Sequence, residues 1–317
     1  MQFGPLYVSD TEGYDVEKRP GIFSGKIGVA FLAPALVFVA IFLILPFFWI
    51  FYLSFTNRTL TGITAAHPEF VGLANYERLF DTDRWMRLGE FGNALWITAR
   101  FVLGSAILGQ AVVGLTIAWF FYRRKGFLRE LVFTTAVLAW IIPEVVVAFA
   151  WSAFLDVDRG TLNTILAALG LGKPDWLFDH PLLSIIIFNT WRGSAFSILL
   201  FSSALETIPP SYVETADVVG ASGWRKFRDI FFPLMRGHIL TDLILITLWT
   251  FNVFTPFLLT GGGPRFKTEL VSIYTYRTAF KFFEFGKGSA IAVVMMLINL
   301  TLAMGYLIML RRQKVAS

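Results

Sequence analysis

Six long apolar segments dominate this chain and leave little choice of fold. They cover residues 27–55, 92–122, 131–155, 182–205, 239–259 and 288–310. Each is near or above the ~20 residues that a helix, rising ~1.5 Å per residue, needs to cross the hydrocarbon of a bilayer. Because backbone polar groups in hydrocarbon must find partners inside the protein, such segments are expected to be helical. The sequence therefore predicts an all-α membrane protein with six transmembrane helices.

The composition agrees with one membrane domain. Of the 317 residues, 56% are hydrophobic and 15% charged, and the mean hydropathy of +0.65 exceeds that of ordinary soluble domains. The first segment carries no charge, and the residues before it lack the basic start of a signal peptide, so we interpret it as an uncleaved span. We expect an N-terminal segment at 1–26, a six-span domain at 27–311 with an outer excursion at 56–91, and a tail at 312–317.

Basic residues gather at alternate flanks of the segments: before the first, after the second, between the fourth and fifth, and after the sixth. The positive-inside rule then places both termini in the cytoplasm. The net charge of +5 therefore reflects membrane topology and lipid contact, and no nucleic-acid partner is expected. Arg265, Lys267, Arg277 and Lys281 break the pattern, and we expect 268–283 to lie along the outer surface.

Catalytic chemistry finds little support. The chain has no cysteine, and its histidines, His67, His180 and His238, fall in different loops or span ends, so neither a metal site nor a histidine-based triad is expected. The stretch 261–268 lacks the second glycine of a phosphate loop and no strand precedes it. We expect a non-catalytic subunit that itself binds no cofactor. A membrane enzyme and a stand-alone secondary transporter remain alternatives, although no internal repeat supports the latter.

A polar segment at 206–238 separates the fourth and fifth spans. Pro209 and Pro210 suit the first turn of a helix, and Gly220 permits a tight turn, which predicts a short exposed helix. The spacing resembles the E-A-A-x3-G-x9-I-x-L-P motif of permease subunits in binding-protein-dependent ABC importers, with Thr215 and Phe232 as departures. The resemblance implies a cytoplasmic coupling helix that contacts an ATPase through Glu214, Thr215, Ala216, Gly220, Ile230 and Pro233.

Further stretches resemble carbohydrate permeases similar to the larger membrane subunit of maltose-type importers. They lie at 70–80, 158–166, 189–196, 258–264 and 274–280. The resemblance implies the type I ABC importer architecture, in a bacterial or archaeal plasma (inner) membrane, and an oligosaccharide, sugar alcohol or related carbohydrate as substrate.

The same resemblance implies the partners. They are a second homologous permease that completes a heterodimer, two cytoplasmic ABC ATPase subunits that bind ATP and Mg, and an extracytoplasmic substrate-binding protein. The turn formed by Gly261, Gly262, Gly263 and Pro264 is expected on the outer face, where it would contact the binding protein.

Polar and aromatic groups inside two spans are candidates for binding the carbohydrate, because aromatic rings suit pyranose faces and amides suit hydroxyls. They are Asn189, Arg192, Gly193 and Phe196 in the fourth span and Leu245, Trp249 and Asn252 in the fifth. The resemblance implies that the fourth-span stretch contributes to the sugar pocket together with the fifth span, where Leu245, Trp249 and Asn252 lie one helical face apart. Packing between spans is the other explanation for the aromatic residues.

Two charges near span midpoints need a partner, because an unpaired charge there costs ~2.5–3.5 kcal/mol. Glu144 and Arg192 could pair, which we favour. Alternatively, Arg192 could bind an anionic substrate such as a uronate oligosaccharide or glycerol phosphate. Asp242 and Arg100, nearer span ends, are expected to reach water. Small residues along the second span, Ser105, Gly109, Gly114 and Ala118, predict close helix packing.

Overall fold

The computed structural model of the protein describes residues 25–315. Most of the expected N-terminal segment at 1–26 and the end of the tail at 312–317 lie outside the described residues. The chain divides after Trp49 into two units. The first unit contains α1 (Gly25–Val39), a π-helical turn, η1 (Ala40–Ile44), and the start of α2 (Leu45–Leu53), which continues past Trp49. Large apolar side chains such as Phe42 and Leu43 are exposed there, as contact with lipid requires.

Helices account for all regular structure among the described residues, which confirms the predicted all-α fold. Five helical runs are long and apolar enough to cross a membrane, and they agree with five of the six predicted spans. They are Val29–Leu53, Phe91–Phe120, Pro181–Glu206, Gly223–Thr260 and Phe285–Arg312. A bent pair of helices stands where the third span was predicted, and it makes a sixth if the pair is one span.

The third predicted span, 131–155, is not one continuous helix. The structure has α7 (Phe127–Ile141) and α8 (Glu144–Phe154), which meet at an angle of 111°. Pro143 causes the break, because proline has no N–H to donate and restricts the residue before it to extended backbone. Ile142 is extended accordingly, with ψ of 134°. The bend leaves Glu144 in the first turn of α8.

The helix α10 (Pro181–Glu206) lies among the other spans. It packs against α7, α13 and the second span, which consists of α5 (Phe91–Val102), η2 (Leu103–Ala111) and α6 (Val112–Phe120). A Cβ on Gly109 would lie 2.1 Å from the Thr190 hydroxyl oxygen, and one on Gly114 would lie 2.4 Å from Ser197 Cβ. The predicted close packing along the second span is therefore present, and glycine is what permits it.

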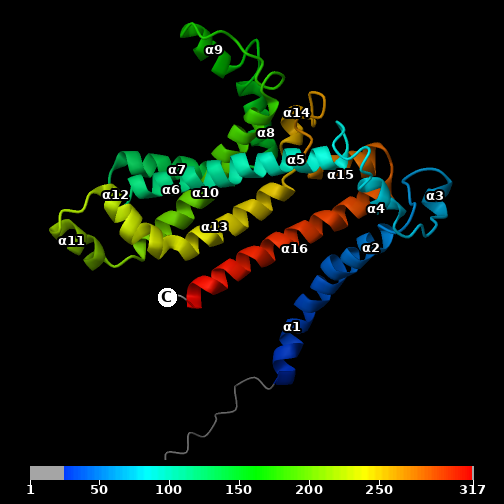
Figure 1. The fold of residues 1–317 in the computed structure, drawn as a ribbon, viewed down its shortest axis with the longest axis horizontal. Coiled ribbons are helices and arrows are strands. Elements are labelled where there is room, and N and C mark those ends of the chain that lie inside the picture. Colours follow the sequence, from blue (N-terminus) through cyan, green and yellow to red (C-terminus); the bar gives the residue numbers. More distant parts are fainter. Residues whose placement is uncertain (1–24, 316–317) are drawn as a thin grey trace, which may run out of the picture. The chain divides into compact units, whose positions relative to one another are not determined.

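The segment 206–238 and the fifth span share one helix. After α11 (Pro210–Val218) the chain turns at Gly220, and α12 (Gly223–Lys226) continues through η3 (Phe227–Phe231) into α13 (Phe232–Asn252). The helix thus begins well before residue 239, the predicted start of the span. It ends at Asn252, and a short α14 (Phe257–Thr260) follows. Figure 1 shows α11 and α12 at one end of α13 and α14 at the other.

Short helices fill the connections. They are α3 (Ile63–Ala66) and α4 (Ala74–Leu79) in the excursion, α9 (Thr161–Ala168) after α8, and α15 (Val271–Tyr276) with η4 (Arg277–Lys281) before the last helix, α16 (Phe285–Val315). The segment 268–283, expected along the outer surface, packs one face against the chain, since Leu270, Val271 and Tyr274 are buried. Arg277 pairs with the buried Glu269 at 2.7 Å, so part of the unexpected positive charge is neutralised within the chain.

Candidate functional site

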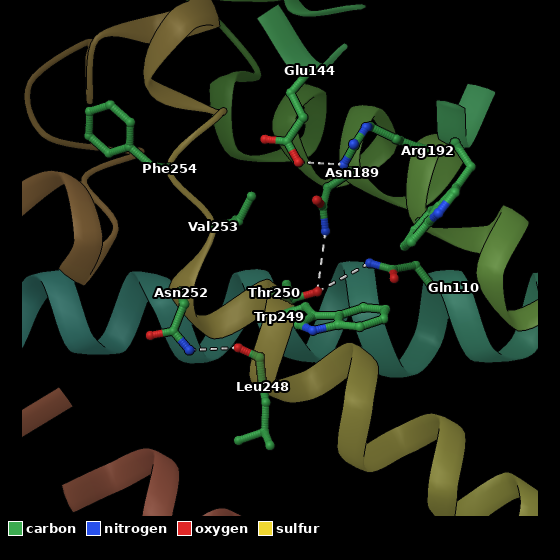
Figure 2. A pocket seen from close by; sticks show the side chains of 12 residues that line it. Gln110, Glu144, Asn189, Arg192, Leu248, Trp249, Thr250, Asn252, Val253 and Phe254 are labelled. Atoms are coloured by element: carbon green, nitrogen blue, oxygen red, sulfur yellow. Dashed lines mark hydrogen bonds and ion pairs between the residues drawn. The ribbon is translucent and has the colours of Figure 1, made fainter. Parts of the chain in front are cut away.

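A cavity of about 530 Å³ opens among the spans. The residues around it come from η2, α7, α8, α10 and the end of α13 with the stretch that follows it (Figure 2). They are Gln110, Trp140, Glu144, Asn189, Arg192, Gly193, Leu248, Trp249, Thr250, Asn252, Val253 and Phe254. The volume lies within the ~300–1,000 Å³ typical of small-molecule sites.

Two helix breaks meet at this cavity. One is the bend between α7 and α8, and the other lies between α13 and α14, where Val253 is extended with ψ of 136°. The hydroxyl of Thr255, in the second break, donates a hydrogen bond to Glu144 Oε2, just after the first. Non-helical backbone at membrane depth is tolerated where it is buried in protein or lines a water-filled cavity. The two breaks therefore indicate that this cavity can hold water or a polar ligand.

Arg192 and Glu144 form the expected ion pair. Arg192 Nη1 lies 2.9 Å from Glu144 Oε1, with 19% of the arginine side chain and 47% of the glutamate side chain exposed. Figure 2 shows the two side chains reaching toward each other from α10 and α8. The guanidinium also lies 5.7 Å from the Trp140 ring centre, and the start of α8 favours a carboxylate through the helix dipole. The pair cancels the two formal charges that line the cavity.

Side-chain amides form the polar floor of the cavity. Asn189 Nδ2 donates to the Ser105 hydroxyl at 3.0 Å and lies 3.5 Å from Thr250 Oγ1. Gln110 Nε2 donates to the same threonine oxygen at 3.3 Å. Gly193 leaves room for this glutamine, since a Cβ there would lie 2.2 Å from Gln110 Oε1. Gln110 itself belongs to η2, and such π-helical turns often occur at functional sites.

Aromatic rings form one wall. Phe196 lies 4.9 Å from Trp249 and 5.6 Å from Trp140, between ring centres, and the two tryptophans lie 5.7 Å apart. Trp249 remains 48% exposed, so its ring is available to a ligand. Phe196 does not line the cavity, and it packs against the two tryptophans that do.

The structure brings together five of the seven residues predicted to bind substrate: Asn189, Arg192, Gly193, Trp249 and Asn252. Phe196 and Leu245 do not line the cavity, and Leu248 does. Asn252 bonds with Asn299 of α16, at 3.0 and 3.1 Å, which holds its amide in place. Sequence reasoning missed Gln110, Trp140, Thr250 and Phe254. A glutamine within an apolar span was an available signal, because polar groups there are rare and mostly functional.

Asp242 does not reach water, contrary to expectation. Its side chain is fully buried between α13 and α10, and the Ser197 hydroxyl lies 2.9 and 3.1 Å from its two oxygens. The close approach of α6 to α10 at Gly114 covers this region, because the missing Cβ brings the backbone onto Ser197. Burial by a neighbouring helix is not visible in the position of Asp242 along its own span.

The predicted coupling residues lie on and beside α11. Glu214 and Thr215 are exposed, Ala216 is buried, and Pro233 is exposed on α13. Gly220 adopts a φ of +69°, and the N–H of Ala221 donates to Ala216 O at 2.9 Å, which closes the helix end as the predicted tight turn. Ile230 and Ala216 line a groove with Ser211, Tyr212 and Thr215. A groove beside an exposed short helix can receive a partner's side chains.

The stretch Gly261–Pro264 forms a closed loop at the other end of α13. Thr268 donates through its hydroxyl to Gly263 O at 2.7 Å, and its oxygen lies 2.7 Å from the Thr260 hydroxyl. A continuous helix from Gly223 to Asn252 is about 45 Å long, so this loop and α11 lie at opposite ends of the fifth span.

Comparisons with known proteins agree with the architecture. The family model described as "Binding-protein-dependent transport system inner membrane component" matches residues 110–315. The chain is 30% identical to the sulfoquinovosyl glycerol transport system permease protein SmoG of Agrobacterium fabrum, over 90% of each chain. It is 31% identical to the trehalose/maltose transport system permease protein MalF of Thermococcus litoralis, over 89% of this chain and 92% of that one.

A solved structure has the same fold. It is a chain of a bacterial ABC transporter involved in the import of the acidic polysaccharide alginate, with a TM-score of 0.75 and 21% identity over 90% of this chain and 96% of that one. A second structure describes the alginate transporter in complex with an alginate pentasaccharide-bound periplasmic protein, with a TM-score of 0.72 over 90% and 94% of the two chains, at 21% identity.

Proposed function

Because this chain belongs to the family of binding-protein-dependent transport system inner membrane components, we propose that it is the permease subunit of an ATP-driven importer of an uncharged carbohydrate. Its cavity offers an exposed tryptophan ring, side-chain amides and hydroxyls, which are the groups that complement pyranose faces and sugar hydroxyls. The observation that carries the proposal is the ion pair of Arg192 and Glu144, which leaves the cavity polar but without net charge.

The pair also bears on the alternative of an anionic substrate. An anion could bind Arg192 bidentately only by displacing Glu144, and the carboxylate would then remain in the cavity as a repulsive neighbour. The relatives' names span different substrates, trehalose and maltose for one and sulfoquinovosyl glycerol for another. These names do not indicate one substrate charge, whereas the paired charges of this cavity favour an uncharged substrate.

The subunit acts with partners in this proposal. A second permease would complete the pathway, an extracytoplasmic binding protein would deliver the carbohydrate near the loop Gly261–Pro264, and two ATPase subunits carrying ATP and Mg would hold α11 and its groove. Movement of α11 would pass to the fifth span directly, because η3 and α13 form one helix from the groove to the cavity. ATP hydrolysis would belong to the partner subunits, and both termini would be cytoplasmic.

Uptake by the reconstituted complex tests the function. Proteoliposomes holding the assembled importer, with ATP inside and loaded binding protein outside, should accumulate a neutral oligosaccharide but not a uronate oligosaccharide of equal length. Trp249→Ala should reduce uptake at least tenfold, whereas Trp96→Ala, at a tryptophan 55% exposed and away from the cavity, should not. Preferred uptake of the uronate would overturn the substrate assignment, and ATP-independent uptake would overturn the importer assignment.

A further inference from the structure

A second cavity lies beside the coupling residues. It has a volume of about 220 Å³ and shares no lining residue with the first. It is lined by Ala118, Phe121, Tyr122, Arg123, Arg124, Lys125, Arg129, Phe133, Ser202, Leu205 and Glu206. The Tyr122 ring lies 5.0 Å from Phe231 of η3, and Val213 of α11 belongs to the same apolar cluster as Leu205. The cavity is thus at the α11 end of the bundle.

Positive charge in this cavity exceeds what the chain neutralises. Arg129 lies 3.1 Å from Glu130 and 3.7 Å from Glu206. Within residues 25–315, no carboxylate lies within ion-pair distance of Arg123, Arg124 or Lys125. The Arg124 guanidinium is held over the Phe120 ring at 4.1 Å. Three cations therefore remain available to an anion, two of them guanidinium groups suited to bidentate contact with phosphate.

Uncharged donors accompany the cations. The hydroxyl oxygen of Ser202 is buried and has no hydrogen-bond partner among the described residues, although it belongs to the cavity lining. The helix α7 begins next to the cavity residues Lys125 and Arg129, with Gly126 as N-cap and no side-chain cap. Uncapped amides at a helix start favour phosphate oxygens. The positive-inside rule explains basic residues here, but it explains neither the cavity nor the unpartnered hydroxyl.

The backbone conformation at Arg123 also supports an anion site. Arg123 adopts a φ of 56°, a left-handed conformation that is uncommon for residues other than glycine. A turn of this shape is formed more easily by glycine, yet the position carries a guanidinium that lines the cavity. The apolar surroundings indicate a membrane location, since Phe127 is 81% exposed and Phe120 is 49% exposed.

We propose that this cavity binds the phosphate group of an anionic phospholipid at the cytoplasmic surface of the membrane. The leaflet rests on the orientation given under the proposed function, whereas the phosphate chemistry rests on the cavity alone. Basic cavities between transmembrane helices are suited to such headgroups. An occupant would contact α6, α7 and α10 at once, next to the cluster that holds α11. It would therefore stabilise the packing of the helices that contact α11.

Lipid retention by the intact complex tests the proposal. The importer, purified with its partner subunits, is exchanged into nanodiscs of phosphatidylcholine with or without phosphatidylglycerol, and bound lipid is counted by native mass spectrometry after release. The wild-type complex should retain phosphatidylglycerol and gain several degrees in melting temperature. R123Q/R124Q should retain at least fivefold less. R311Q/R312Q, which removes two exposed arginines at the end of α16, is the matched control and should behave as wild type.

Further arms separate the other occupants. R123K/R124K keeps the charges, so it should retain the lipid if the complex remains folded. Stabilisation by millimolar inorganic phosphate in detergent, equal to that by phosphatidylglycerol, would overturn the lipid as occupant. Loss of ATPase subunits from R123Q/R124Q would show that the cavity is a protein contact instead. Equal lipid retention by R123Q/R124Q and R311Q/R312Q would refute the site, while substrate uptake, read separately, reports on the proposed function.

Discussion

Arg192 and Glu144 occupy positions where either charge alone would be costly. Each lies within a predicted span, and each has a second contact: Arg192 faces the Trp140 ring, and Glu144 accepts the Thr255 hydroxyl. A charge in hydrocarbon favours pairing because water is not available to solvate it. The partly exposed carboxylate still borders the cavity, so the pair can shape the site while remaining neutral.

Removing one partner should harm assembly more than removing both. We expect Arg192→Leu and Glu144→Leu each to lower the yield of assembled complex by an amount equivalent to about 2 kcal/mol, and the double variant to recover much of this loss. The more exposed pair Arg84 and Asp81, 3.9 Å apart with 63% and 40% of their side chains exposed, provides the control, and its leucine variants should show no coupling. Additive losses at Arg192 and Glu144 would contradict the pairing.

Glu269, which lies outside the membrane-spanning helices, should make the stability of the protein depend on pH. Burial raises its pKa from 4.5 to about 7, against the opposing effect of Arg277. A carboxyl group with a raised pKa in the folded state contributes stability below pH 4.5 and loses it as the pH rises through 7. The shift corresponds to about 3 kcal/mol.

We therefore expect the melting temperature of the wild-type complex to fall, relative to that of Glu269→Gln, as the pH is raised from 4.5 to about 7. Thermal unfolding of both complexes at half-unit steps of pH provides the measurement. Glu77→Gln changes an exposed carboxylate and should track the wild type. Parallel curves for wild type and Glu269→Gln would be inconsistent with a raised pKa.

At the scale of elements, the positions of the helix ends determine where the cavity lies. The breaks after α7 and α13 bring Glu144, Thr255 and Val253 together around the cavity. The helix from α12 to α13 continues without a break and connects the cavity to the segment around α11. A stiff element with a cavity at one end and a groove at the other can transmit rigid movement, as in hinge-type closures. Proline accounts for the break at Pro143, and Pro256 follows the break after α13.

Replacing Gly220 by a β-branched residue should distort the turn, because such residues rarely adopt a positive φ. A left-handed residue other than glycine costs roughly 1–2 kcal/mol, so Gly220→Val should shift α11 and reduce ATPase stimulation by loaded binding protein at least fivefold. Gly223→Val is the matched control: that glycine also has open space around it but no positive φ, and coupling should be retained. Equal stimulation in both variants would remove Gly220 from the coupling assignment.

At the scale of the whole molecule, the two ends of the fifth span should face opposite compartments. The loop after α14 and the segment at α11 are separated by the length of α13, and basic residues gather at the α11 end. The absence of cysteine from the sequence makes single labels easy to place. Lys267 and Val219 are exposed at the two ends, so each can carry a label without entering the core.

In intact cells, Lys267→Cys should react with a membrane-impermeant maleimide, and Val219→Cys should react only after permeabilisation. Mass-tagged maleimide followed by electrophoresis reads both variants in the same experiment. Labelling of Val219→Cys in intact cells, with protection of Lys267→Cys, would invert the orientation and with it the assignment of the cavity beside α11 to the cytoplasmic surface.

The sequence by itself determined the class, the number of apolar runs and the tight turn at Gly220, because these depend on composition, length and local spacing. Segment length suffices to identify a helix that can cross hydrocarbon, and Gly220 needs only its own φ to make a turn. The same holds for the charges at Glu144 and Arg192, whose need for a partner follows from their depth along each span. Pairing was therefore predictable as a hypothesis before any geometry was known.

The tertiary structure decided which side chains meet. Leu245 follows the helical spacing of Trp249 and Asn252 but does not line the cavity, while Gln110, from a distant span, does. The burial of Asp242 depends on Gly114 of another helix, and the 111° bend turned one apolar run into two helices. In a membrane protein apolar residues cover every face of a span, so periodicity does not reveal which face is inside. Helix packing assigns the faces, and in this protein glycines and proline breaks determine that packing.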